Sequence, residues 1–228
     1  MWQETKLGWG RRAGRGVAVL GVAWAGLCAW TGPALADLES GGPWAGLMQG
    51  CDIIDGVEHC SFHVNGWKFY AYYEGDTPPG LLAALERLPA NLPLLLEGAL
   101  GTIGDITAEI TLTGVRLDPQ GDAHARLREQ LQGPWVSVDD PDAAFEVFGS
   151  ELRWLHAGRY AGHEFLQILP RCGELVSDDQ PLLRMTEPED HEMSRCYAVL
   201  HSDGRTLDLS YLPRGNTLRY RRPAMSER

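Results

Sequence analysis

Residues 61–74 of the chain read SFHVNGWKFYAYYE. Two runs rich in aromatic and β-branched residues, 61–64 and 67–74, flank the pair Asn65-Gly66. Asparagine and glycine tolerate the positive φ angles of a type I′ turn, which joins two adjacent antiparallel strands. The stretch therefore predicts a β-hairpin, and the neighbouring elements can be assigned outward from it.

The second strand of this hairpin carries aromatic side chains on both faces. Because strand residues alternate between faces, two groups form: Trp67, Phe69, Ala71 and Tyr73, and Lys68, Tyr70, Tyr72 and Glu74. Such a strand is covered on both sides or lies at a binding surface. We therefore take Tyr70 and Tyr72 as candidate binding residues, with packing as the alternative.

The hairpin belongs to a first module at residues 37–119. Residues 37–50 are rich in glycine and have no hydrophobic period, which predicts a mobile lead-in. The run Asp76-Thr77-Pro78-Pro79 combines an N-cap residue with prolines in a first turn, so a short helix is expected there. Strands are expected at residues 92–100 and 106–117.

The last of these strands changes its alternation at Gly114. The apolar positions shift by one residue there, which predicts a β-bulge. Over residues 61–117 the order strand, strand, helix, strand, strand resembles the middle of an OB-like barrel. That resemblance implies a β surface that binds oligonucleotides or oligosaccharides through aromatic side chains, supplied here by Tyr70 and Tyr72.

A linker helix at residues 120–132 separates the two modules. Asp122 is its expected cap, and its period places Ala123, Leu127 and Leu131 inward and Arg126, Arg128 and Glu129 outward. Residues 133–228 follow as six or seven short strands, with a polar loop at 173–193. The fold class is mainly β with short helices: two small antiparallel β modules, the first α+β and the second a meander or partial barrel.

The start of the second module has a short motif, Gly133-Pro134-Trp135. Together with the preceding helix, it resembles the lipocalin-like families over residues 122–222. In those families a helix leads into G-x-W, and an arginine from the end of the barrel covers the indole. The resemblance implies Arg219 or Arg221 over Trp135, and it implies a carrier of a small apolar ligand. Six or seven strands fall short of the eight-stranded cup of those families.

Residues 1–36 have the three parts of a signal peptide. Basic residues between Arg11 and Arg15 precede the uncharged apolar run 17–30, and Ala34-Leu35-Ala36 supplies small residues for cleavage. The apolar run has fourteen residues, and a spanning helix needs about 20, so a retained anchor is the weaker alternative. We predict a soluble mature chain from about Asp37, without a membrane span, in the periplasm or secreted.

The charge of the mature chain disfavours nucleic acid as a partner. Residues 1–36 hold four Lys or Arg and one Glu, so the rest has 16 basic and 30 acidic residues, a net of −14. The long-range field of such a chain repels phosphate backbones and anionic lipid.

Cysteine use agrees with export. Cys28 leaves with the signal, and the four remaining cysteines are expected to pair locally, as Cys51–Cys60 and Cys172–Cys196. The alternative is a metal site at Cys51, His59, Cys60 and His63. The chain has no C-x-x-C motif, so we expect disulfides, no bound metal and no cofactor.

The remaining chemistry indicates binding more than catalysis. No nucleophile elbow, phosphate loop or paired-histidine zinc motif occurs, so no catalytic residue is assigned. Arg214, Arg219, Arg221 and Arg222 gather near the C-terminus of an acidic chain. Arg214, Arg219 and Arg221 are candidate residues for an anion or an acidic partner; the alternative is an edge strand protected by charge.

We therefore expect an exported, non-enzymatic protein that binds a partner protein or a component of the cell envelope. Two alternatives remain open. One is the lipocalin-like carrier, which requires a cavity of about 300 Å³ or more in the second module. The other is a hydrolase of cell-wall polymer, which requires two close carboxyl groups, one with a raised pKa.

Overall fold

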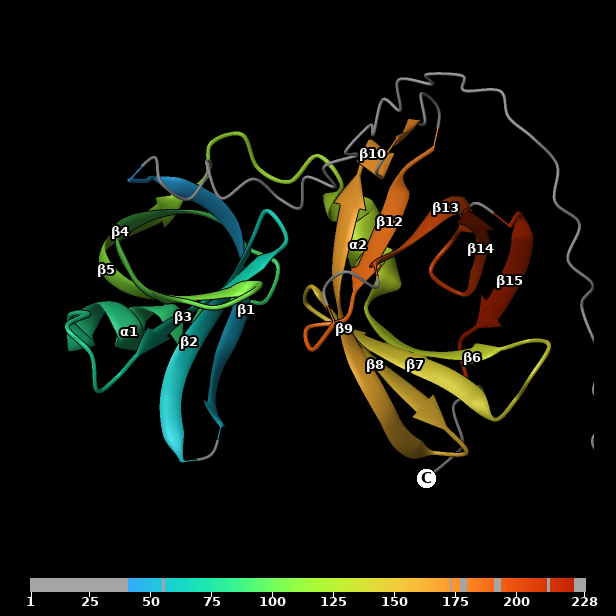
Figure 1. Cartoon of the computed structure of the whole chain (residues 1–228), viewed down its shortest axis with the longest axis horizontal. Helices are drawn as coiled ribbons and strands as arrows, with labels where there is room; N and C mark the ends of the chain where they lie inside the picture. Colours follow the sequence, from blue (N-terminus) through green and yellow to red (C-terminus); the bar gives the residue numbers. More distant parts are fainter. Residues whose placement is uncertain are drawn as a thin grey trace, which may run out of the picture. The chain divides into compact units, whose positions relative to one another are not determined.

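Two closed β-barrels form the described part of the chain (Figure 1). The computed structural model describes residues 41–54, 56–172, 174–176, 180–190, 194–212 and 214–223, without the side chains of residues 175 and 176. The predicted signal peptide lies outside these residues. From Gly41 on, the described chain belongs to one compact unit. The predicted fold class, mainly β with two β modules, is confirmed.

The first barrel has the strand order β1-β2-β3-β5-β4. Its elements are β1 (Trp44–Ile54), β2 (Val57–Val64), β3 (Trp67–Tyr72), α1 (Pro79–Leu85), β4 (Pro93–Ile103) and β5 (Thr107–Leu117). The pairing of β3 with β5 is parallel, and the other pairs are antiparallel. Alternate strand residues, among them Phe62, Phe69 and Leu96, fill its core.

The predicted hairpin is confirmed. Asn65 and Gly66 have φ angles of 46° and 89°, and Val64 faces Trp67 across the turn. The predicted bulge is confirmed as well. Glu97 faces Gly114, but Gly98 faces Leu112, so β5 has one extra residue between the two pairs.

The predicted lead-in at residues 37–50 is wrong for residues 44–50, which form most of β1. The strand pairs with β2 on one side and with β4 on the other. At Gly46 a Cβ would lie 2.8 Å from a methyl group of Val64, so this glycine allows close packing between strands. Its presence therefore reflects the neighbouring strand, which local composition does not reveal.

The second barrel is an antiparallel meander of eight strands, in the order β12-β13-β14-β15-β6-β7-β8-β9. They are β6 (Gly133–Ser137), β7 (Ala143–Phe148), β8 (Glu151–His156), β9 (Arg159–Leu169), β12 (Leu182–Thr186), β13 (Ser194–Ser202), β14 (Thr206–Leu212) and β15 (Asn216–Arg221). Two further short strands, β10 (Arg171–Cys172) and β11 (Leu175–Val176), pair with each other. The expected count of six or seven strands was too low because β12 lies in the predicted polar loop. Its five residues pair with β9 and β13.

Helix α2 (Ala125–Leu131) precedes the second barrel and buries one residue that was expected outside. Leu131 is buried, as predicted, but Arg128 is also buried, at 6% exposure. The Arg128 Nε donates to Asp122 Oδ2 over 2.7 Å, and its Nη1 donates to Ser150 Oγ. This pairing compensates the charge, which allows the guanidinium to be buried.

Arg222 covers Trp135, and the prediction of Arg219 or Arg221 is wrong. The Arg222 guanidinium lies 3.9 Å from the centroid of the indole. Arg219 and Arg221 are exposed, whereas Tyr220 between them is buried. Residue 222 is two positions after the buried Tyr220, so the alternation of β15 continues past the end of the strand and places Arg222 on the inward side. This strand pairs with both β14 and β6, so the alternative of a protected edge strand is wrong too.

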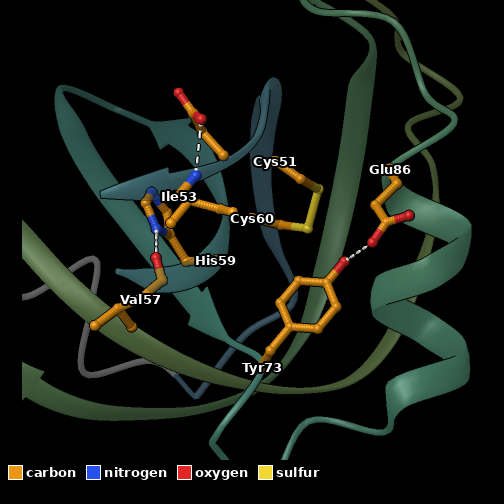
Figure 2. The surroundings of a disulfide bond; sticks show 8 residues. Cys51, Ile53, Val57, His59, Cys60, Tyr73 and Glu86 are labelled. Atoms are coloured by element: carbon orange, nitrogen blue, oxygen red, sulfur yellow. Dashed lines mark hydrogen bonds between the residues drawn. A yellow bond between two sulfur atoms is a disulfide. The ribbon is translucent and has the colours of Figure 1, made fainter. Parts of the chain in front are cut away.

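Both predicted disulfides are confirmed. Cys51 and Cys60 are directly opposed on β1 and β2 and are bonded across the strands (Figure 2). Cys172 of β10 is bonded to Cys196 of β13. Among the residues described, no helix is both long and apolar enough to cross a membrane.

Candidate functional site

The outer face of β2 and β3 carries the predicted aromatic pair. Cys60, Phe69 and Ala71 are buried in the barrel core, so their strand neighbours point outward. The register places His59 opposite Tyr72 and Ser61 opposite Tyr70. We call His59, Tyr70 and Tyr72 the tyrosine face.

The rings of the tyrosine face are packed together. Tyr70 and Tyr72 are parallel to within 13°, with centroids 6.1 Å apart. The His59 ring meets Tyr70 edge-on at 5.2 Å and lies 5.9 Å from Tyr72. His59 is only 3% exposed, whereas both tyrosines are half-buried, so each tyrosine keeps part of its surface accessible.

A hydrogen bond to the backbone fixes the orientation of the His59 ring. His59 Nδ1 donates to the carbonyl of Val57 over 3.2 Å (Figure 2), because a carbonyl can only accept. This bond leaves Nε2 as the other polar atom of the ring. The hairpin that carries His59 is itself fixed by the disulfide at Cys60, one residue further along β2.

Carboxylates flank the tyrosine face on two sides. On β5, Glu109 is the cross-strand partner of Tyr70, and on β1, Asp52 is the partner of His59. Burial, Glu109 and Tyr70 together raise the pKa of the Tyr72 hydroxyl above its ordinary value, so Tyr72 is a neutral hydrogen-bond donor at neutral pH. The arrangement combines flat apolar rings with acceptors, which suits stacking against a ligand with hydroxyl groups.

The next residues on the same face contact the second barrel. His63 Nε2 lies 3.2 Å from Glu151 Oε1, and the Lys68 ammonium pairs with the same oxygen. We call His63, Lys68 and Glu151 the inter-barrel cluster. The His63 ring also meets Phe165 of β9 edge-on at 4.9 Å.

All three side chains of the inter-barrel cluster are largely buried, which shifts two of their pKa values. Burial, with the nearby charges of Lys68 and Arg128, lowers the pKa of His63 despite the opposing effect of Glu151. Burial favours the protonated form of Glu151, but the hydrogen bond from His63 and the charge of Lys68 outweigh it. The pKa of Glu151 is lowered to about 2. At neutral pH the cluster is therefore a neutral imidazole beside an ammonium–carboxylate pair.

A side-chain amide adds two further bonds between the barrels. Gln49 Nε2 donates to the carbonyl of Phe148 over 2.8 Å, and its Oε1 accepts from the backbone N–H of Ser150 over 2.9 Å. A pocket of about 240 Å³ lies beside this contact, lined in part by His63, Asp122 and Arg128. It is smaller than the pockets of about 300–1,000 Å³ that hold drug-sized ligands.

The structure does not bring the predicted binding residues into one site. Tyr70 and Tyr72 belong to the first barrel, whereas the three arginines belong to the second. Arg219 and Arg221 share the outer face of β15, and Arg219 Nη2 lies 2.8 Å from Asp139 Oδ1 in an exposed ion pair. Arg214 lies in the turn before β15 and is exposed.

The inter-barrel cluster was not predicted from the sequence, and no functional role was predicted for Lys68. The contacting residues are 83 or more positions apart, as His63 and Glu151 show with a separation of 88. The available signal was a run of polar residues alternating with core residues at His59, Ser61 and His63. That pattern marks an outward face, but it does not say what covers the face.

A second polar group lies inside the second barrel. Trp154 Nε1 donates to Glu164 Oε2 over 2.8 Å, and the Arg195 guanidinium pairs with Glu164. Arg195 also lies over the Trp154 ring at 5.5 Å. Glu164 is buried, and Arg195 is partly exposed. The neighbouring interior, which includes Leu166 and Tyr197, is packed as one apolar cluster.

Comparison with known protein families, with curated proteins and with solved structures finds no match to this chain.

Proposed function

We propose that this chain is an exported binding protein that holds a carbohydrate component of the cell envelope on the tyrosine face. The observation that carries the proposal is the half-buried, parallel pair of Tyr70 and Tyr72, packed against the buried ring of His59. Rings that are already packed lose little further freedom when a ligand stacks on them.

The chemistry around the rings favours a saccharide over a nucleic acid. Both ligands can stack on tyrosine. However, Glu109 and Asp52 border the face, and the mature chain has a net charge of −14, from 16 basic and 30 acidic residues. Carboxylates accept hydrogen bonds from sugar hydroxyl groups but repel phosphates. A neutral or cationic glycan therefore fits this surface best.

Export is supported by the cysteines and by the N-terminal sequence. Both disulfides need an oxidising compartment. The basic, apolar and small-residue regions of residues 1–36 have the pattern of a signal peptide, which would direct the chain to such a compartment. These features support a periplasmic or secreted location, which would bring the tyrosine face into contact with envelope polymers.

Co-sedimentation with insoluble envelope polysaccharide tests the proposal. The mature chain is compared with Tyr70→Ala, Tyr72→Ala and the double variant. A ring that stacks on a ligand is worth about 1–3 kcal/mol, so each single change should weaken binding about fivefold or more. Tyr160→Ala is the matched control, because Tyr160 is 64% exposed on the second barrel and should bind as the wild type does. Unchanged binding by the double variant, or no binding of any polysaccharide fraction, would overturn the proposal.

A second candidate function is carriage of a small ligand by the second barrel. The group Glu164, Arg195 and Trp154 favours it, since paired charges and an indole inside a barrel can orient a ligand. The packed interior below this group argues for a shallow site. The hydrolase alternative has less support. Where the pKa of a described carboxyl group is clearly shifted, as at Asp122 and Glu151, it is lowered, whereas the acid of such an enzyme needs a raised one.

A further inference from the structure

We propose that the inter-barrel cluster is an acid-released latch, which holds the second barrel against the first at neutral pH and sets the position of Tyr70. The latch itself is independent of the proposed function. Only its consequence for ligand binding rests on that function.

The latch has one acceptor for two donors. Glu151 Oε1 is the contact atom for both His63 Nε2 and the Lys68 ammonium. Glu151 is at the start of β8, and the two donors are on β2 and β3. Removing the charge of Glu151 therefore weakens both contacts of the inter-barrel cluster at once.

The surroundings of His63 disfavour a positive charge on its ring. The groups that face it are Glu151 on β8, Lys68 on β3 and Arg128 on α2, while β9 contributes the apolar ring of Phe165. Arg128 is paired with Asp122 and Lys68 with Glu151. Protonated His63 would be an additional buried cation beside a carboxylate that Lys68 already neutralises.

Acid therefore favours the open state. With the barrels closed, the pKa of His63 lies below the ordinary value of 6.5. With the barrels apart, the ring is hydrated and has its ordinary pKa. The open state then binds the proton more tightly, and its share rises about tenfold for each pH unit below 6.5, until the closed-state pKa is reached.

The latch is linked to the tyrosine face through one side chain. The Lys68 ammonium lies 5.2 Å from the centroid of the Tyr70 ring while it pairs with Glu151. When Glu151 moves away, Lys68 loses its partner and becomes hydrated, so the contact with Tyr70 is lost. Acid should therefore loosen the edge of the tyrosine face that is nearer to the second barrel.

Amide hydrogen exchange measured by NMR tests the latch without any ligand. The reporter is the N–H of Ser150, which bonds to Gln49 of the other barrel. The reference is the N–H of Val138, which bonds to Arg219 within the second barrel. After correction for intrinsic exchange, protection of Ser150 should fall about tenfold for each pH unit below 6.5, until the closed-state pKa of His63 is reached, while that of Val138 stays constant.

Two variants and one control make the result specific. In His63→Gln the amide can still donate to Glu151 but cannot titrate, so Ser150 protection should no longer depend on pH. In Glu151→Gln the protection of the Ser150 N–H should already be low at neutral pH. The control is His201→Gln, which removes an exposed histidine near Asp203 and should behave as the wild type does. The latch is wrong if His63→Gln keeps the pH response, or if Ser150 protection in the wild type does not change between neutral pH and about pH 5.

The link to Tyr70 has its own readout. Polysaccharide binding, measured by co-sedimentation, should be weaker at about pH 5 than at neutral pH in the wild type and equal at both in His63→Gln. Equal pH dependence in both proteins would overturn the link. No binding at neutral pH would contradict the proposed function instead, and the exchange data would still decide on the latch.

Discussion

The C-terminal arginines show how one position in a strand decides the role of a side chain. Arg221 is exposed, whereas Arg222 covers Trp135 and donates to the carbonyl groups of Gly204, Pro134 and Gln130. The two residues are adjacent and chemically identical. Only the alternation of β15, continued past its end, separates a surface charge from a structural one.

Arg222→Ala should lower the free energy of unfolding by about 2 kcal/mol, because the stacking contact and hydrogen bonds to backbone carbonyls are lost together. Urea denaturation followed by tryptophan fluorescence measures this change. Arg221→Ala is the matched control and should change the free energy by less than about 0.5 kcal/mol. Equal effects of the two substitutions would show that the contact with Trp135 does not contribute to stability.

At the level of strands, the β4–β5 bulge depends on one glycine. A Cβ on Gly98 would lie 2.1 Å from the carbonyl oxygen of Thr111, which is backbone and cannot rotate away. Gly98→Ala should therefore lower the free energy of unfolding by about 2 kcal/mol or more, by forcing the bulged pair apart. The measurement is the urea midpoint at constant slope.

Gly80→Ala is the control for this prediction. Gly80 lies in α1, and a Cβ there meets no atom within 4 Å. Alanine is the better helix former, so this change should stabilise the chain by about 0.5–1 kcal/mol. A Gly98→Ala protein as stable as the wild type would show that the bulge can move to a neighbouring residue.

The disulfides should differ in their effect on stability. Cys51 and Cys60 are 9 residues apart, and Cys172 and Cys196 are 24 apart. The entropy of loop closure in the unfolded chain predicts losses of about 2.5 kcal/mol and about 3.5 kcal/mol when each pair is changed to serine. Thermal unfolding of the two double variants shows which disulfide contributes more to stability. A larger loss for the Cys51–Cys60 pair would mean that the β1–β2 hairpin depends on its disulfide beyond chain entropy.

For the molecule as a whole, Glu151 should govern stability in acid. Its pKa is about 2 in the folded chain and 4.5 ordinarily, so the unfolded chain takes up the proton first as the pH falls. The contribution of Glu151 is complete above pH 4.5. It amounts to about 3 kcal/mol and is lost as the pH falls from that value toward the folded pKa. His63 adds a smaller loss that begins at its ordinary pKa of 6.5.

Glu151→Gln tests this contribution. The variant should be about 3 kcal/mol less stable at neutral pH and should lose less stability on acidification, as measured by urea denaturation over a pH series. Glu97→Gln is the control, since its pair with Arg116 is about half exposed on each side and contributes less than about 1 kcal/mol. A wild-type pH profile in Glu151→Gln would exclude the carboxylate as the source.

Part of the fold and of the candidate site could be predicted from local patterns in the sequence. The Asn65-Gly66 turn, the bulge at Gly114 and the local disulfides each depend on residues that are close in sequence, and all three are confirmed. The candidates Tyr70 and Tyr72 came from the same alternation, which assigns a face without naming what covers it.

The sequence did not predict contacts between residues that are far apart along the chain. Strand β1 was missed because it pairs with β4, which lies far along the chain, and Arg128 was expected outside because the helical period does not show its contact with Ser150 of the second barrel. The inter-barrel cluster joins residues 88 positions apart. Burial of a charge depends on the partner it meets in space, and that partner exists only once both barrels have closed.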